Sequence, residues 1–222
     1  MADCLPSIVG GCGIEIIKSD ACGIPVLGAN NYIRSKGFVR FSMTPEIEAG
    51  TAVREYNMCG DLCVDRPACP IPIGFNAKLE LCKVDPAVLS LLLGYTPIMG
   101  GVANADIVGM SAVGSANNVC NHFSMKIWGV NDGSCGGAEA PYVVFILPHA
   151  LNPVLSSELV FAKDTKQTWA IDFVVRDGNA LYEDPGAIFA DAEVQGRPLA
   201  WKCAASIPAY TNPGEFGTIG VV

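Results

Sequence analysis

Apolar and polar residues alternate most clearly between Ile73 and Lys83. Apolar side chains take every second position of this run, at Ile73, Phe75, Ala77, Leu79 and Leu81. Because successive side chains of a strand point to opposite faces, this period predicts a strand with one buried and one solvated face. Runs of similar character predict further strands over residues 38–43, 121–130, 142–147, 158–163 and 167–176.

One short helix is predicted directly after this strand. Asp85 suits the N-cap, Pro86 suits the first helical position, and Gly94 suits the C-terminal stop. We expect the helix to pack on the outer face of a sheet, with Leu92 against apolar neighbours. One helix among six or more strands predicts a mainly β fold, an antiparallel sandwich or barrel with one packed helix.

Three segments lack a regular pattern. Residues 1–36 are rich in glycine and turns, residues 45–72 contain four prolines, and periodicity fades after Asp177. We therefore expect a long loop over 45–72 and an N-terminal arm over 1–36. We also expect a C-terminal extension over about 178–222. The chain is then a single domain, 1–222, with a core over about 38–178.

Composition favours a folded chain that binds neither nucleic acid nor membrane. Half of the residues are apolar and 16% are charged, which is enough to build a sizeable core. The net charge is −8, and lysines and arginines are scattered, whereas phosphate binding needs them clustered. The most apolar uncharged stretch, between Glu139 and Glu158, is broken by three prolines, so we expect no membrane span.

The ten cysteines leave a metal site open as an alternative. The N-terminal segment does not resemble a signal peptide, because its first basic residue is Lys18, so we expect most thiols to be reduced. Four cysteines could supply a tetrahedral zinc site: Cys59, Cys63, Cys69 and Cys82. Their spacing is not that of paired CxxC motifs, which favours ordinary loop and core thiols.

Catalytic motifs are nearly absent from the sequence. Cys120 lies two residues before His122, so the pair could share one face of a strand and form a nucleophile with its base. No residue that would orient the histidine is identifiable, and no phosphate loop, dinucleotide fingerprint or HExxH motif occurs. We therefore expect no enzymatic activity and no cofactor.

Several motifs, taken in order, resemble those of one family. A Cys-Gly-Asp-Leu-Cys loop at 59–63 leads into the alternating strand over 75–83 and the capped helix over 85–94. Residues 123–128 resemble a strand that begins with an aromatic residue and ends with Trp, and residues 142–148 an apolar strand ending in Pro. In this order the chain resembles the major tail proteins of long-tailed, siphovirus-like bacteriophages, particularly those infecting actinobacteria.

The resemblance covers roughly residues 38–178 and implies a structural subunit of a phage tail tube. Such proteins form hexameric rings that share a β-barrel around a channel, and the rings stack through long loops and terminal arms. The implied partners are other copies of the chain and the tape measure, terminator and distal tail proteins, while genomic DNA passes without specific binding. The implied location is the virion tail, assembled in the cytoplasm of the bacterial host.

The resemblance also implies roles for charged residues. Contacts between subunits or rings would involve the loop residues Glu46, Glu48, Arg54, Asp61, Asp65 and Arg66. The channel wall would include Glu80, Asp172 and Asp177, and the charge of −8 predicts a net negative channel. The alternatives are another β-rich virion component, such as a tail terminator or baseplate hub piece, a cysteine-rich zinc-binding protein, or a cysteine-dependent enzyme.

Overall fold

The computed structural model describes most of the chain as antiparallel β structure. It describes residues 8–28, 30–36, 38–56, 58–59, 62–67, 69–81, 85–100, 106–112, 121–131, 140–157, 168–186 and 188–209. The strands are β1 (Ile8–Ser19), β2 (Tyr32–Ser35), β3 (Phe38–Glu48), β4 (Val53–Tyr56), β5 (Leu62–Arg66), β6 (Ile71–Leu81), β7 (Thr96–Gly100), β8 (Asp106–Ser111), β9 (His122–Asn131), β10 (Tyr142–Leu155), β11 (Trp169–Arg176) and β12 (Ala200–Ala204). The helices are α1 (Pro86–Leu93) and α2 (Asp191–Val194). The prediction of a mainly β, antiparallel protein is thus confirmed.

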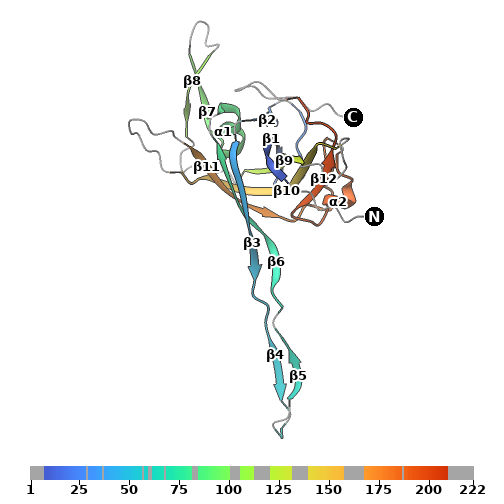
Figure 1. Cartoon of the computed structure of the whole chain (residues 1–222). Helices are drawn as coiled ribbons and strands as arrows, with labels where there is room; N and C mark the ends of the chain where they lie inside the picture. Colours follow the sequence, from blue (N-terminus) through green and yellow to red (C-terminus); the bar gives the residue numbers. More distant parts are fainter. Residues whose placement is uncertain are drawn as a thin grey trace.

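Eight strands form one curved sheet in the order β2-β1-β9-β10-β11-β6-β3, with β12 also paired to β10 (Figure 1). The first half of β10 pairs with β12 and its second half with β11, while β9 occupies the opposite edge. A register shift between Leu147 and Ala150 separates the two halves, as bulges do where a strand bends. The sheet is not a closed barrel, because β2 and β3 lie at the two ends of the strand order and do not pair with each other.

The predicted strands agree with the structure where it describes them. In β6, Ala77, Leu79 and Leu81 are buried and alternate with more exposed residues, as the sequence indicated. The strands predicted over 121–130 and 167–176 correspond to β9 and β11. The strand predicted over 158–163 lies outside the described residues.

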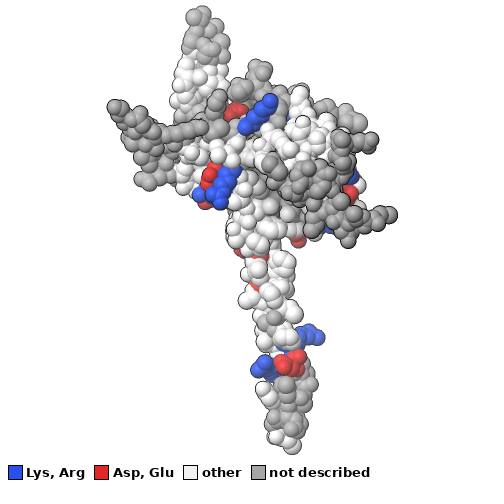
Figure 2. All heavy atoms as spheres, viewed as in Figure 1, with Lys and Arg blue, Asp and Glu red and all other residues white. Residues whose placement is uncertain are grey.

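A long hairpin projects from the sheet (Figures 1 and 2). The outer parts of β3 and β6 leave the body as a pair, and β4 and β5 continue the same ribbon outward. The expected irregular loop over 45–72 is therefore wrong. All four side chains of β4 are exposed, so no burial pattern marks this part of the ribbon in the sequence.

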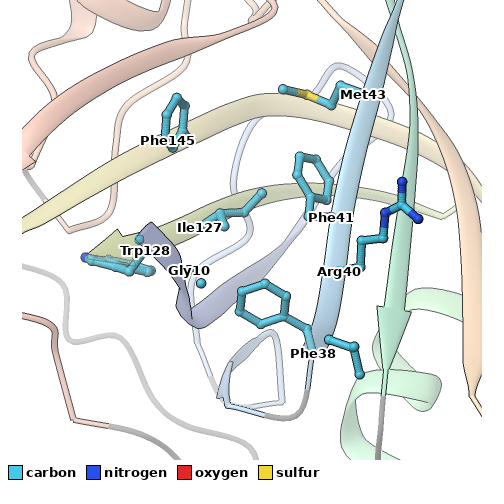
Figure 3. Close-up of a pocket in the computed structure, with 11 residues that line it drawn as sticks. Gly10, Phe38, Arg40, Phe41, Met43, Ile127, Trp128 and Phe145 are labelled. Atoms are coloured by element: carbon cyan, nitrogen blue, oxygen red, sulfur yellow. The ribbon is translucent and has the colours of Figure 1, made fainter. Parts of the chain in front are cut away.

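A hollow marks the place where the curved sheet fails to close (Figure 3). It has a volume of about 400 Å³ and lies between β1, at Gly10 and Gly11, and β3, at Phe38 and Phe41. A side chain at Gly11 would overlap the far end of the Phe38 ring, so the ring packs directly against the backbone of β1 at this glycine. Aromatic and aliphatic side chains thus line the seam, where β1 and β3 are not paired as neighbouring strands.

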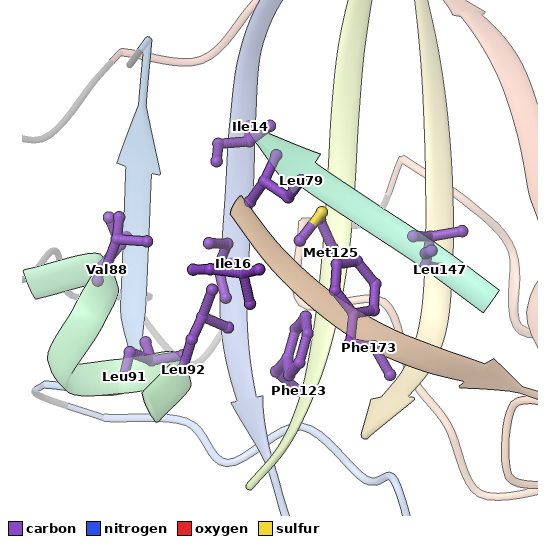
Figure 4. Packing of buried hydrophobic residues seen from close by; sticks show 14 of the residues in the cluster. Ile14, Ile16, Leu79, Val88, Leu91, Leu92, Phe123, Met125, Leu147 and Phe173 are labelled. Carbon is purple, nitrogen blue, oxygen red and sulfur yellow. The ribbon is translucent and has the colours of Figure 1, made fainter. Parts of the chain in front are cut away.

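The main core lies on the inner face of the curved sheet (Figure 4). Side chains from β1, β6, β9, β10 and β11 meet there, and Val88, Leu91 and Leu92 of α1 point into the same space. The predicted helix caps are confirmed: the Asp85 side chain accepts a hydrogen bond from the Ala87 N–H, and Gly94 is left-handed. The expected position on the outer face is wrong, because α1 buries apolar residues on several sides and contributes to this core.

The two terminal segments also differ from expectation in their described parts. Residues 8–19, expected in an arm, form β1 between β2 and β9. Both faces of β1 are covered, so Ile14, Ile16 and Ile17 are all buried and give no alternating signal. Beyond Asp177 the chain is not an extended tail but packs on the outer face of the sheet.

That C-terminal segment forms a second core cluster. Tyr182, Phe189 and Val194 are buried against Trp128 and Ile146, on the face of β9 and β10 opposite the main core. Before β12, which pairs with β10, the segment contacts the sheet through isolated side chains separated by turns. Such contacts leave no periodic pattern, which explains why the sequence did not reveal them.

Candidate assembly surfaces and a buried charge cluster

The projecting hairpin, residues 46–72 of β3, β4, β5 and β6, is hereafter the arm. Several of its apolar side chains are exposed, with Ile47 and Tyr56 each at 60% and Ile71 at 56%. Scattered exposed apolar residues are common in proteins, but here they lie on a two-stranded ribbon that has no core of its own. The arm therefore presents an apolar surface that the described chain does not cover.

Figure 2 shows that charges on the arm gather toward its far end. Arg54 Nε lies 3.1 Å from Asp65 Oδ1 across the β4–β5 pair, and both side chains are exposed. An exposed ion pair of this kind adds only about 0–1 kcal/mol to stability. Arg66 is also exposed there, so three of the predicted contact residues are available to a partner.

The other predicted contact residues lie elsewhere. Glu46 Oε2 accepts a hydrogen bond from Arg176 Nη1 at 2.6 Å, which holds the base of the arm against β11. Glu46 is therefore engaged within the subunit. Glu48 is exposed at the end of β3, and Asp61 lies outside the described residues.

Two of the three predicted channel residues share one polar face. Glu80 on β6 lies opposite Arg40 on β3, and Asp172 on β11 lies opposite Lys78 on β6. This face points away from the main core, while Asp177 is exposed beyond the end of β11. In the described part of this face two acids face two bases, so the expected excess of negative charge is not found there.

The cysteine alternatives receive no support from the described residues. Cys59 and Cys69 are exposed on the arm, whereas the Cys63 side chain and Cys82 lie outside the described set. Among the described side chains, no three His, Cys, Asp or Glu residues are close enough together to hold a metal ion. Cys120, the proposed nucleophile, also lies outside the described residues.

His122 has a partner that the sequence did not indicate. Its Nδ1 lies 3.0 Å from Nε2 of His149, and the two rings stack with their centroids 5.3 Å apart. Burial lowers the pKa of His149, and the nearby His122 lowers it further. The pair joins β9 to the bent part of β10, which is a structural role.

A group of charged residues is buried between the sheet and the C-terminal segment. This buried charge cluster comprises Glu15 on β1, Arg34 on β2, Lys126 on β9 and Asp184. Lys126 Nζ lies 2.5 Å from Asp184 Oδ1 and 3.0 Å from Glu15 Oε1. Burial also raises the pKa of the neighbouring Tyr182 hydroxyl.

Sequence reasoning missed this cluster, although a signal was present. Lys126 interrupts the apolar strand over 123–128, and Glu15 interrupts the apolar run over 14–17. A charge within a fully buried strand needs a partner of opposite sign. The sequence therefore indicated that Lys126 and Glu15 pair with each other, but nothing in it identified Asp184 as a further partner.

In sequence, no protein family matches the chain, and none of the curated proteins compared with it does either. In the part of the chain that the structure describes, no helix has the length and apolar character needed to cross a bilayer.

Proposed function

We propose that the protein is the structural subunit of a phage tail tube, which assembles into stacked rings around a DNA channel. The arm is the observation that supports this function best. It extends from an antiparallel sheet, exposes Ile47, Tyr56 and Ile71, and buries none of them against its own subunit. A ribbon of this length gains stability when it lies against a neighbouring copy, because that contact removes apolar area from water.

The open sheet supports the same proposal. Edge strands present unpaired backbone groups that pair readily with another chain. Here β3 is an edge strand along Phe38–Glu48 and carries the arm at its end. Ring formation through such edges would complete in the assembly the closure that the single chain lacks.

The arm can be tested by removing its outer part, residues 50–69, which carries Tyr56. In this variant an Asn-Gly turn joins Ala49 to Pro70, next to the β3–β6 pairs that remain. We expect the variant to unfold at the same temperature as the parent, because none of the described residues of the arm belongs to either core cluster. We also expect it to remain monomeric in sedimentation velocity.

A point variant and a matched control sharpen this test. Tyr56→Ser should weaken assembly, whereas Leu181→Ser, which removes a similarly exposed apolar side chain elsewhere, should assemble as the parent does. Normal tubes from the variant with the shortened arm would contradict the proposal that the outer arm joins subunits.

We also propose that the polar face of β3, β6 and β11 lines the channel. A wall on which each base faces an acid holds duplex DNA weakly, so DNA passes without specific binding. The double variant Glu80→Gln, Asp172→Asn leaves Arg40 and Lys78 unopposed. Its tubes should retain duplex DNA in a salt-dependent manner, measured by co-sedimentation.

The control for the channel test is Glu183→Gln with Asp191→Asn, which removes two exposed acids from the C-terminal segment. This control should bind no more DNA than the parent. If the Glu80, Asp172 variant also fails to bind DNA at low salt, the face does not line the channel.

A further inference from the structure

Lys126 and Asp184 lie in a pocket closed to water. The side chains of Glu15 and Lys126 are each 1% exposed and that of Asp184 is 0% exposed. Glu15 and Lys126 face one another across the β1–β9 pair, while Asp184 comes from the C-terminal segment. Nζ lies at ion-pair distance from both carboxylates, yet neither contact has the angles of a hydrogen bond.

The carboxyl group of Asp184 is held by backbone donors. Its Oδ2 accepts hydrogen bonds from the N–H groups of Ile188, at 2.9 Å, and Phe189, at 3.0 Å. Its Oδ1 faces Nζ and accepts only a longer bond, 3.3 Å, from Gly186. Two fixed donors on Oδ2 would stabilise negative charge that develops there if a nucleophile added to the carboxyl carbon.

Glu15 is oriented as a proton carrier. Its Oε2 accepts hydrogen bonds from Arg34 Nε at 2.6 Å and from the Tyr32 hydroxyl at 3.0 Å. These two bonds leave Oε1 directed to Nζ of Lys126. The nucleophile, the electrophile and a base therefore meet in one dry site, held by three different segments of the chain.

We propose that Lys126 and Asp184 condense into an isopeptide bond, with Glu15 carrying the proton. A proton first passes from the ammonium to Oδ1 of Asp184, which leaves a neutral amine and a neutral acid. Nζ then attacks the carboxyl carbon, the C–N bond forms and negative charge collects on Oδ2. Glu15 takes a second proton from nitrogen and returns it to the Oδ1 hydroxyl, which leaves as water. The step needs no oxidant and no co-reactant.

Two physical effects favour this reaction. Fixed contact between the reacting groups replaces a bimolecular encounter and so lowers the barrier to reaction. The product also replaces two buried charges by one neutral amide, while Glu15 keeps Arg34 as its partner. The bond would fasten the C-terminal segment to β9 and does not depend on the proposed tube function.

Mass spectrometry of the purified full chain tests the proposal. After denaturation and reduction of any disulfides, the mass of the intact protein should be lower than the mass calculated from its sequence by one water molecule. Trypsin does not cut after an acylated lysine, so the digest should contain one branched peptide that joins residues 84–163 to residues 177–202. If residues 84–126 and 177–202 appear as separate, unmodified peptides after long incubation of the folded protein, the proposal is overturned.

Three variants separate the bond from a simple ion cluster. Lys126→Arg keeps the charge but should give the full sequence mass. Asp184→Asn keeps the shape and should still form the bond: Glu15 Oε1 takes the first proton from Nζ in place of Oδ1, and ammonia leaves in place of water. Glu15→Gln keeps both reacting groups and should remain unlinked; a Glu15→Gln protein that links as fast as the parent would overturn the role of Glu15. If the folded Asp184→Asn protein shows the full mass calculated from its own sequence, the condensation itself is overturned.

Discussion

At the scale of single residues, the histidine pair provides a test of pH dependence. Burial lowers the pKa of His149 below its ordinary value of 6.5, and His122 adds to the effect, while Asp20 and the backbone of Asp177 oppose it. The unfolded chain therefore binds this proton more readily than the folded chain. The stability that depends on neutral His149 should be fully present above pH 6.5. The free energy of unfolding should fall as the pH drops below that value.

Urea unfolding across a pH series measures this effect. His149→Gln should lose less stability than the parent between neutral and mildly acidic pH, since one group that resists protonation has been removed. Equal losses in the two proteins would show that the acid sensitivity comes from other groups, such as the buried carboxylates.

Residue-level chemistry was the least predictable part of the molecule. The helix caps at Asp85 and Gly94 could be read from the sequence, because a cap depends on neighbours along the chain. The buried charge cluster could not, because it joins Glu15, Lys126 and Asp184 across three segments. The partners of a buried charge depend on the register of β1 and β9 and on the path of the C-terminal segment, which the sequence pattern does not specify.

At the scale of elements, α1 is the best place to test how the core is built. Leu92 is fully buried among β-sheet side chains, so Leu92→Asp places an unpaired charge in the main core. We expect a loss on the order of 3–5 kcal/mol, enough to prevent stable folding. Thermal unfolding followed by circular dichroism measures the loss.

Ser90→Asp is the matched control on the same helix. Ser90 is only half-buried, and an acid in the last turn of a helix costs less than about 1 kcal/mol. A folded, soluble Leu92→Asp protein would show that α1 is not part of the core.

Elements with one buried face were predictable and those without one were not. The alternation in β6 and β11 follows from burial on one side and solvent on the other. The arm has solvent on both faces and β1 has protein on both, so neither shows a period of two. The predictions of an irregular loop over 45–72 and of an N-terminal arm over 1–36 were wrong for this same reason.

At the scale of the whole molecule, the chain has surfaces that its own fold leaves uncovered. The sheet stops at the edge strands β2 and β3, and the arm exposes apolar residues such as Tyr56 beyond any core. Such surfaces are usually protected in a protein that functions as a monomer. Assembly of identical copies through β3 and the arm would cover both features.

Electron microscopy of the purified full chain at increasing concentration tests the proposed function most directly. We expect rings, or hollow tubes of uniform diameter with sixfold end views, to form without any cofactor or partner. Particles that remain single subunits up to millimolar concentration, with monomeric sedimentation of the same samples, would contradict the tail tube proposal.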